Sequence, residues 1–481
     1  MQSLFPVINK KDFCKKIFSD IRFYLILFFI VRMYGITHPP LEAAHHWRQS
    51  LVAMVSRNFL EENNNIFYPR VDIAGEKSGI TGMEFPLLNY LIYIMSLLFG
   101  YTHWYGRLIN LIVSSFGLFF YYKLIKNYYN KDIAFNATLI LCVSVWFQFS
   151  RKIMPDTFSM SLVMVSVYFA TNYFDHNKNR FLNLIFCFVL LTAGILSKIS
   201  SAYLLVIFSF FILSKSYTYT HKIVFILTIS VSILIAYVWY FYWVPYLMNY
   251  YGYRCFFMGK DFHTGLMEII SGFRSTLRMF YDVPLKYIGF AAFLSGLYFS
   301  FRENAKRIYI TWAVCFLAFS VFIIKSGNLF FIHTYYIIPF VPVMAWVAGY
   351  GIERMKQKKI ALILLSGIVI EGISNQQHDF RIPEYNKNLL NIESHLDLIS
   401  GRKDKILINS GDCPTPMYFA HRKGWISFNN NILNKNYIHD LKLNGLKYIV
   451  ILKKTFGSDI KLLDYKKVFE NNLYTIYKIS E

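Results

Sequence analysis

The chain has 481 residues, of which 55% are hydrophobic, 19% aromatic and only 16% charged. Soluble domains carry roughly a quarter of their residues as Asp, Glu, Lys and Arg, so the composition excludes an ordinary soluble protein of this length. A net charge of +22 would suit nucleic-acid binding, but much of the charge lies in short loops between apolar runs. That pattern indicates a multispanning membrane protein, so we expect a lipid bilayer and no nucleic acid as partner.

Apolar segments of membrane-spanning length recur along the chain, and we predict eleven spans. The first, 18–36, lacks a small-residue cleavage site and is predicted to be retained rather than removed as a signal peptide. The others are 107–122, 132–150, 156–172, 181–197, 199–214, 222–245, 285–301, 308–324, 333–350 and 359–374. The shorter stretch 86–100 is predicted to lie in the membrane interface.

The positions of Lys and Arg decide the orientation, because short basic loops stay in the cytoplasm. If 86–100 does not cross, nearly every short basic loop lies on one side of the membrane. These loops are 10–16, 123–131, 176–180, 215–222, 302–307 and 353–359. We therefore predict a cytoplasmic N-terminus, with the long loop 37–106 and the C-terminal tail outside.

Two domains are expected: a transmembrane domain over 1–374 and a small extracytoplasmic α/β domain over 375–481. The tail contains three short runs typical of β-strands, 404–410, 446–454 and 473–480. Within the first outer loop, the apolar periodicity of 51–62 predicts a helix.

Nothing in the sequence supports a nucleotide, a zinc site or a disulfide framework. The cysteines form no CxxC pair, and most lie in or near apolar runs; they are Cys14, Cys142, Cys187, Cys255, Cys315 and Cys413. Walker A, Rossmann, HExxH and GxSxG motifs are absent in suitable contexts.

The segment HPPLEAAHHWRQS directly follows the first predicted span and is rich in ionisable groups. Glu42 is a candidate general base, His45 and His46 are candidate proton shuttles or phosphate ligands, and Arg48 has the fork that suits phosphate oxygens. The alternative is that these residues face water in the headgroup zone, with Trp47 as an interfacial anchor.

Further carboxylates occur at the edges of later apolar runs. Asp72 and Glu84 lie in the first outer loop, and Glu84 directly precedes Phe85-Pro86 at an apolar boundary. Asp156 follows Arg151 and Lys152 at the start of a span. Glu84 and Asp156 are each either part of a site or an acidic residue that stabilises the first turn of a helix.

Cationic and aromatic candidates complete the outer face. Lys198 lies at a turn between two apolar runs and is either a phosphate ligand or a snorkelling side chain. Arg254 belongs to a basic region that would attract an anionic headgroup, or is surface charge. His333, Tyr335 and Tyr336 begin a span and either line a polar cavity or form an aromatic belt.

In order, these segments resemble integral-membrane glycosyltransferases of the GT-C superfamily, in the group of protein O-mannosyltransferases and the lipid A aminoarabinose transferase. The resemblance covers roughly residues 20–350 and rests on PPLE…HHWRQ, RNF, YPRVD, MEFPLLNYL, LFGYTHWYGRLINL, SRKIMPDTFSM, GILSKISSAYLL and HTYYIIPFVPVMA. It implies an all-α polytopic membrane domain of GT-C type in a bacterial inner membrane. It also implies a polyprenyl-phosphate-linked sugar donor, an outer-face site, inversion at the anomeric carbon and no cofactor; the acceptor is a glycan, a lipid or a protein.

The resemblance also implies roles for single residues. Family members commonly use an acidic residue of the first outer loop as base, and Glu42 is the nearest one here, although the usual Asp-Glu pair is absent. Asp156 matches the acidic position of the second outer loop, and Lys198 matches a lysine near the lipid phosphate. We place Glu42 narrowly ahead as base, with Asp156 as its orienting partner and Glu84 as the third candidate.

The residue types fit this chemistry, because a carboxylate accepts the hydroxyl proton and cations stabilise the departing phosphate. No obligatory metal is expected, although His45, His46 and the carboxylates are suitable ligands for a divalent ion.

Two alternative functions stay open: a transporter or flippase of lipid-linked glycans, and a ligase or polymerase. A transporter usually has midplane charges and repeated halves. A ligase usually has its largest outer loop late in the chain, whereas here the first loop is long.

Overall fold

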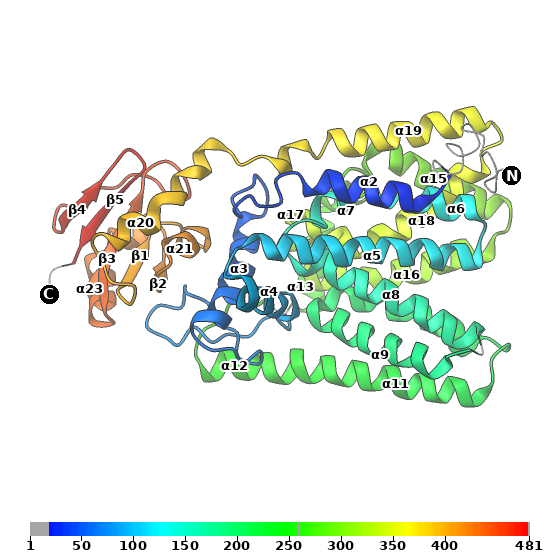
Figure 1. Cartoon of the computed structure of the whole chain (residues 1–481), viewed down its shortest axis with the longest axis horizontal. Coiled ribbons are helices and arrows are strands. Elements are labelled where there is room, and N and C mark those ends of the chain that lie inside the picture. The colour runs from blue at the N-terminus through cyan, green and yellow to red at the C-terminus, as the bar shows by residue number, and fades with distance from the viewer. Residues whose placement is uncertain (1–18, 177, 258, 480–481) are drawn as a thin grey trace, which may run out of the picture.

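The computed structural model describes residues 19–176, 178–257 and 259–479. Figure 1 shows a bundle of long helices with a small sheet domain beyond one of its ends. The predicted basic segment 10–16 and Cys14 lie outside the described residues.

The bundle is built from apolar helices, and the long ones run along a common direction (Figure 1). They are α2 (Ile21–Met33), α5 (Trp104–Tyr128), α6 (Lys131–Val143), α7 (Val145–Phe149), α8 (Pro155–Asp175), α9 (Arg180–Ser197), α10 (Phe208–Leu213), α11 (Tyr219–Tyr237), α12 (Val244–Tyr250), α15 (Lys286–Arg302), α16 (Lys306–Ser326), α18 (Val341–Arg354) and α19 (Lys358–Ser374). Three further helical segments adjoin these helices. η1 (Ile199–Ile207) precedes α10 and η3 (Thr334–Phe340) precedes α18, and both are 3₁₀ helices; η2 (Val238–Trp243) is a π-helix between α11 and α12.

Among the described residues, five helical segments are long and apolar enough to cross a membrane. They are Trp104–Tyr128, Arg180–Ser197, Tyr219–Tyr250, Lys306–Ser326 and Thr334–Arg354. A sixth is added if the bent pair α14 (Phe273–Tyr281) and α15 forms one span. The chain is therefore an integral membrane protein, whereas the count of eleven spans stays a prediction.

Two predicted spans have interruptions that hydropathy does not reveal. The span predicted over 132–150 is divided at Ser144, whose hydroxyl accepts a hydrogen bond from the backbone of Trp146 and starts α7. The span predicted over 199–214 begins as the 3₁₀ segment η1 before it becomes helical. The short apolar stretch 86–100 forms α4 (Leu87–Phe99), and its place at the interface stays a prediction.

Close packing of α8 on α9 brings the end of the predicted span 181–197 beside the start of the preceding span, 156–172. Gly194 of α9 lies so near α8 that an added Cβ would stand 3.1 Å from the Ser159 carbonyl oxygen. The Ser159 hydroxyl donates to the Gly194 carbonyl at 2.8 Å and ties the two helices together. This seam holds the start of α8 against the end of α9.

The other helices lie between bundle helices along the chain or follow α19 toward and within the sheet domain. They are α3 (His46–Glu61), α4, α13 (Phe262–Ser271), α14, α17 (Leu329–Ile332), η4 (Gln377–Phe380), η5 (Glu384–Asn391), α20 (Ile392–Asp397), α21 (Thr415–Ala420), α22 (Asn429–Ile432) and α23 (Lys435–Leu443). The helix predicted over 51–62 is confirmed as the larger part of α3.

The C-terminal sheet has the strand order β2-β1-β3-β5-β4. Its strands are β1 (Lys405–Ile408), β2 (Gly424–Ile426), β3 (Leu446–Leu452), β4 (Lys466–Glu470) and β5 (Tyr474–Lys478). β1 pairs in parallel with β2 and β3, whereas β5 is antiparallel to β3 and β4. The three predicted strands are confirmed as β1, β3 and β5, and the small α/β domain is present; its boundary at residue 375 stays a prediction.

The first long loop and the sheet domain share one hydrophobic core. Met54 and Val55 of α3 belong to the same buried cluster as Ile406 and Met417 of the sheet domain. Backbone hydrogen bonds reinforce the contact, since Gly75 donates to the Gly424 carbonyl at 2.8 Å. The sheet domain is thus fixed to the loop that carries several of the predicted site residues.

Candidate functional site

Four charged side chains from different segments meet at the end of the bundle nearest the sheet domain; together we call them the Lys198 cluster. Lys198 follows the last residue of α9, and its Nζ donates to Oε1 of Glu84 at 3.1 Å. The same Nζ lies 3.4 Å from Oδ1 of Asp156, in the first turn of α8. Arg48 of α3 forms an ion pair with the same Glu84 oxygen that Lys198 contacts.

The cluster is buried but not sealed. The side chains of Glu84 and Asp156 are 6% and 3% exposed, whereas that of Lys198 is 15% exposed. Within the described part of the chain, Oε2 of Glu84 and Oδ2 of Asp156 are buried and accept no hydrogen bond. Buried carboxylate oxygens normally have partners, so these two atoms are positions where a hydroxyl group of a ligand would be satisfied.

The ionisation of Glu84 follows from its neighbours. Burial opposes the charged form, but the positive charges and hydrogen bonds of Arg48 and Lys198 outweigh it and lower the pKa of Glu84 to about 2. Glu84 is therefore an anion that holds two cations in place, and such a carboxylate is a weak base.

Aromatic rings form one wall beside Lys198. Its Nζ lies 5.5 Å from the centre of the Tyr335 ring, a cation–π contact. The rings of His333 and Tyr335 are stacked at 5.3 Å, and His333 also stacks on Tyr336 at 5.8 Å. The structure thus brings the predicted residues of the late span to the Lys198 cluster.

Glu42 lies in a second group of buried charges, which we call the closed cluster. It is paired with Arg107 of α5, and the Arg151 guanidinium lies 3.2 Å from the same oxygen. The three residues are at most 2% exposed. Burial opposes ionisation, yet Arg107, Arg151 and Lys152 hold the pKa of Glu42 below its usual range.

The two adjacent histidines point to different parts of the molecule because His45 adopts a left-handed backbone conformation (φ 59°). Nε2 of His45 lies 3.2 Å from the Thr334 hydroxyl, and its ring meets Tyr335 edge-on at 5.1 Å. His46 instead contacts the sheet domain, with Nδ1 3.1 Å from the Thr415 hydroxyl. Burial and the nearby Lys152 lower the pKa of His45 to about 3 and that of His46 to about 4, so both are neutral.

Two predicted site residues lie elsewhere. Asp72 is buried between Arg57, at 3.0 Å, and the Asn58 amide, at 2.8 Å, and its carbonyl accepts from Gly424 of the sheet domain. It fixes the loop to that domain. Arg254 is exposed and donates to Asn249 at 2.9 Å, in the manner of a surface residue.

Sequence reasoning missed the role of Arg107 although a signal was present. An arginine in the first turn of an apolar helix is costly unless it has a partner. Its partner, Glu42, precedes it by 65 positions. Among residues 19–176, 178–257 and 259–479, no three His, Cys, Asp or Glu side chains gather closely enough to hold a metal ion.

Part of the chain matches a known family model. Residues 84–243 match the model described as dolichyl-phosphate-mannose-protein mannosyltransferase, a span that includes Glu84, Asp156 and Lys198 but not Arg48. No curated protein matches the chain in sequence.

Solved structures match over nearly the whole chain. ArnT from Cupriavidus metallidurans bound to undecaprenyl phosphate has a TM-score of 0.61 and 12% identity over 95% of this chain and 98% of that one. The apo oligosaccharyltransferase of Archaeoglobus fulgidus has a TM-score of 0.53 and 13% identity over 89% of this chain and 69% of that one. The oligosaccharyltransferase AglB of the same organism, in complex with an inhibitory peptide and a dolichol-phosphate, has a TM-score of 0.51 and 12% identity over 90% and 69%. The chain shares the fold of these proteins, which confirms the resemblance to the GT-C superfamily at the level of fold.

Proposed function

We propose that the protein is a glycosyltransferase that moves a sugar from a polyprenyl-phosphate carrier to an acceptor hydroxyl. The observation that carries the proposal is the Lys198 cluster, in which two cations and two carboxylates share one partly open site. The partial match to a dolichyl-phosphate-mannose-dependent family supports it. So does the similar fold of ArnT, whose structure contains undecaprenyl phosphate.

Lys198 and Arg48 differ in how strongly they are held, and this difference assigns their roles. Among the described residues Arg48 forms an ion pair with Glu84 only, whereas Lys198 is shared between Glu84 and Asp156. An incoming phosphate therefore draws Lys198 first, because its contact with Asp156 is the longest in the cluster. Lys198 then stabilises the negative charge that develops on the departing polyprenyl phosphate.

The same displacement frees Asp156 to act as the general base. The acceptor oxygen forms a bond to the anomeric carbon, its proton moves to Asp156, and the bond between that carbon and the phosphate oxygen breaks. Attack from the side opposite the phosphate inverts the anomeric carbon. Glu84 keeps Arg48 in place throughout. Of the three candidate bases, Glu42 is the least suitable, since two arginines enclose it.

The rings around the cluster supply contacts to the sugar and the acceptor. Tyr335, Tyr336 and His333 form the wall beside Lys198 and suit a sugar face. His45, neutral and adjacent to Tyr335, has a ring nitrogen that hydrogen-bonds a hydroxyl in the present structure. His46 extends the site toward the sheet domain, so we assign the acceptor, whether glycan, lipid or protein, to that side.

A transfer assay tests the proposal. Purified protein in vesicles receives a labelled polyprenyl-phosphate hexose or pentose and a membrane-extract acceptor. Wild type should release polyprenyl phosphate and label the acceptor, and Asp156→Asn should lower turnover by about 10²–10⁴-fold. Asp132→Asn is the matched control, because Asp132 is also an acidic residue in the first turn of a bundle helix but is exposed. Movement of intact donor across the vesicle membrane without cleavage would instead identify a flippase.

The orientation is part of the same proposal. The Lys198 cluster and the sheet domain lie on the extracytoplasmic side of a bacterial inner membrane. Ser78 and Lys442 are exposed in the first long loop and in the sheet domain. In a background with its cysteines replaced by serine, Ser78→Cys and Lys442→Cys should both react with an impermeant thiol reagent added to intact cells. Protection of either site would contradict the orientation.

A further inference from the structure

A cavity of about 490 Å³ opens at the other end of the bundle from the Lys198 cluster. Asp156 lies in the first turn of α8, whereas Thr171, which lines the cavity, lies near the end of the same helix. Their separation corresponds to about 22 Å along the helix axis. The cavity is therefore remote from the proposed transfer site.

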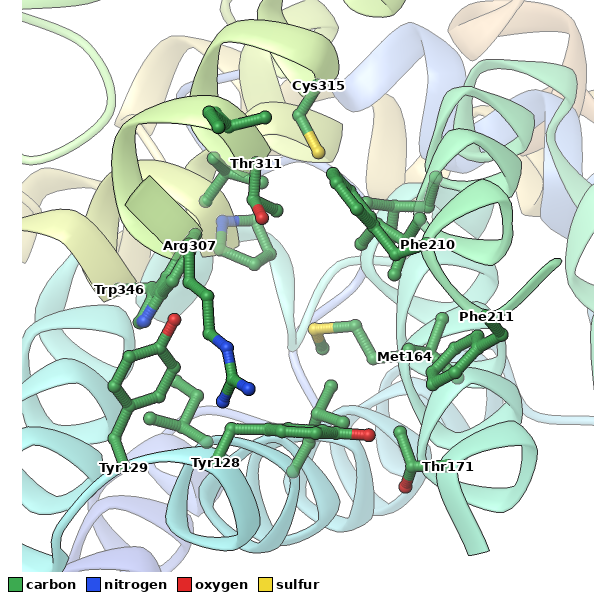
Figure 2. A pocket seen from close by; sticks show the side chains of 18 of the residues that line it. Tyr128, Tyr129, Met164, Thr171, Phe210, Phe211, Arg307, Thr311, Cys315 and Trp346 are labelled. Carbon is green, nitrogen blue, oxygen red and sulfur yellow. The ribbon is translucent and has the colours of Figure 1, made fainter. Parts of the chain in front are cut away.

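The inner part of the cavity is apolar and its rim is cationic. Side chains from α5, α8, α10, α16 and α18 line the cavity, among them Met164, Phe210, Thr311 and Cys315. Figure 2 shows the Arg307 side chain reaching from the rim into the opening beside Tyr128 and Tyr129.

The charges at the rim do not cancel. The hydroxyls of Tyr128 and Tyr217 donate to the two oxygens of Asp175, at 2.9 and 2.6 Å, so that carboxylate is already satisfied. Lys306 and Arg307 are exposed, and neither forms an ion pair with another described residue. The rim therefore presents positive charge above an apolar hollow.

We propose that this cavity binds an acidic glycerophospholipid, with an acyl chain in the hollow and the phosphate at Arg307 and Lys306. The volume lies within the range of about 300–1,000 Å³ of small-molecule sites. The guanidinium fork suits phosphate oxygens, and acidic lipids gather at basic loops on the cytoplasmic side. The proposal rests on the cavity, on its rim and on the orientation proposed above, but it holds whether or not the protein transfers sugar.

Lipid retention measured by native mass spectrometry tests the proposal. The intact protein is placed in nanodiscs of equimolar phosphatidylglycerol and phosphatidylcholine with identical acyl chains. Wild type should retain phosphatidylglycerol in excess. Arg307→Gln should lower that excess about fivefold, the effect of one cation near a membrane surface. Arg302→Gln is the matched control, since Arg302 is exposed at the same end of the bundle and outside the cavity lining, and it should retain the wild-type excess.

A second variant addresses the hollow itself. Thr311→Trp fills the cavity and should release the retained lipid of either headgroup, with folding checked by thermal unfolding. If Thr311→Trp does not fold, the result for Arg307→Gln alone decides whether the proposal holds, because Arg307 is exposed. Equal retention by wild type and Arg307→Gln would overturn the proposal, as would equal retention of the two phospholipids. In nanodiscs that also contain polyprenyl phosphate, loss of polyprenyl phosphate instead of phosphatidylglycerol from Arg307→Gln would also overturn it, because the cavity would then belong to donor binding.

Discussion

The closed cluster around Glu42 and the Lys198 cluster both bury charge, yet they differ in what an arriving ligand would meet. In the closed cluster one carboxylate is paired with two arginines, and the three residues are at most 2% exposed. In the Lys198 cluster two carboxylates share the ammonium group of Lys198, which is close to an aromatic wall. A ligand phosphate has a cation to recruit only in the second.

The difference teaches that a carboxylate in the expected segment is not sufficient evidence for a catalytic base. Burying an ion pair is costly, and the pair is retained where its geometry stabilises a particular arrangement of segments. Arg107 and Arg151 connect the first outer loop to α5 and to the turn before α8. We infer that the closed cluster holds the loop in place so that the Lys198 cluster can assemble.

The largest expected effect is on stability and separates the two clusters. Arg107→Ala leaves part of the Glu42 charge uncompensated in a buried site and should destabilise the protein by about 3–5 kcal/mol. The measurement is thermal unfolding of the purified protein in detergent. Arg22→Ala, which removes an exposed partner of Asp20, is the control and should leave unfolding nearly unchanged. Unchanged unfolding of Arg107→Ala would remove the distinction between the clusters.

A smaller effect is expected on donor binding at Lys198. Lys198→Ala removes a charged hydrogen-bond donor to the phosphate, and the affinity for polyprenyl phosphate should fall about tenfold or more. Lys198→Arg should restore part of it, since the positive charge returns. Binding is measured by displacement of a labelled polyprenyl phosphate, with folding checked in parallel. Wild-type affinity in the alanine variant would mean that Lys198 only stabilises the two carboxylates.

The smallest effect concerns how stability depends on pH at the contact of His421 with Glu61 and Glu393, which joins α3 to the sheet domain and which we call the clasp. His421 lies 2.8 Å from carboxylates of both Glu61 and Glu393, with Arg402 beside it. Burial lowers its pKa, but the two carboxylates raise it more, so the net shift is upward.

A raised pKa means that the clasp is fully formed below the unfolded value of about 6.5 and is lost as the pH rises through the folded value. The difference in unfolding temperature between wild type and His421→Gln should therefore be largest near pH 5–6, and correspond to about 1 kcal/mol or less. It should decrease above neutral pH. A difference that grows with pH would contradict a protonated His421.

The sequence predicts the parts of the site better than their pairing. Asp156 and Lys198 stand at the edges of adjacent apolar runs, so hydropathy and the positive-inside rule place them on one membrane side. The contact between them depends on the approach of Gly194 to α8, which no local pattern reveals. The opposite directions of His45 and His46 depend on one left-handed residue, which has no reliable sequence signal either.

Prediction from sequence is limited in the same way for the sheet domain. β3 has a continuous buried run and was predictable, whereas β2 has only three residues and β4 is largely exposed. Short or polar edge strands lack the alternation on which prediction depends. The attachment of Asp72 to this domain was likewise hidden, because it joins residues some 350 positions apart.

We propose that the Lys198 cluster performs the chemistry and that the closed cluster maintains the structure. The most direct test measures both turnover per folded molecule and unfolding temperature for Asp156→Asn and Glu42→Gln. We expect Asp156→Asn to remain folded with turnover lowered by about 10²–10⁴-fold. We expect Glu42→Gln to lower the unfolding temperature while the molecules that stay folded remain active. A stable but inactive Glu42→Gln together with an active Asp156→Asn would contradict the account and return the role of base to Glu42.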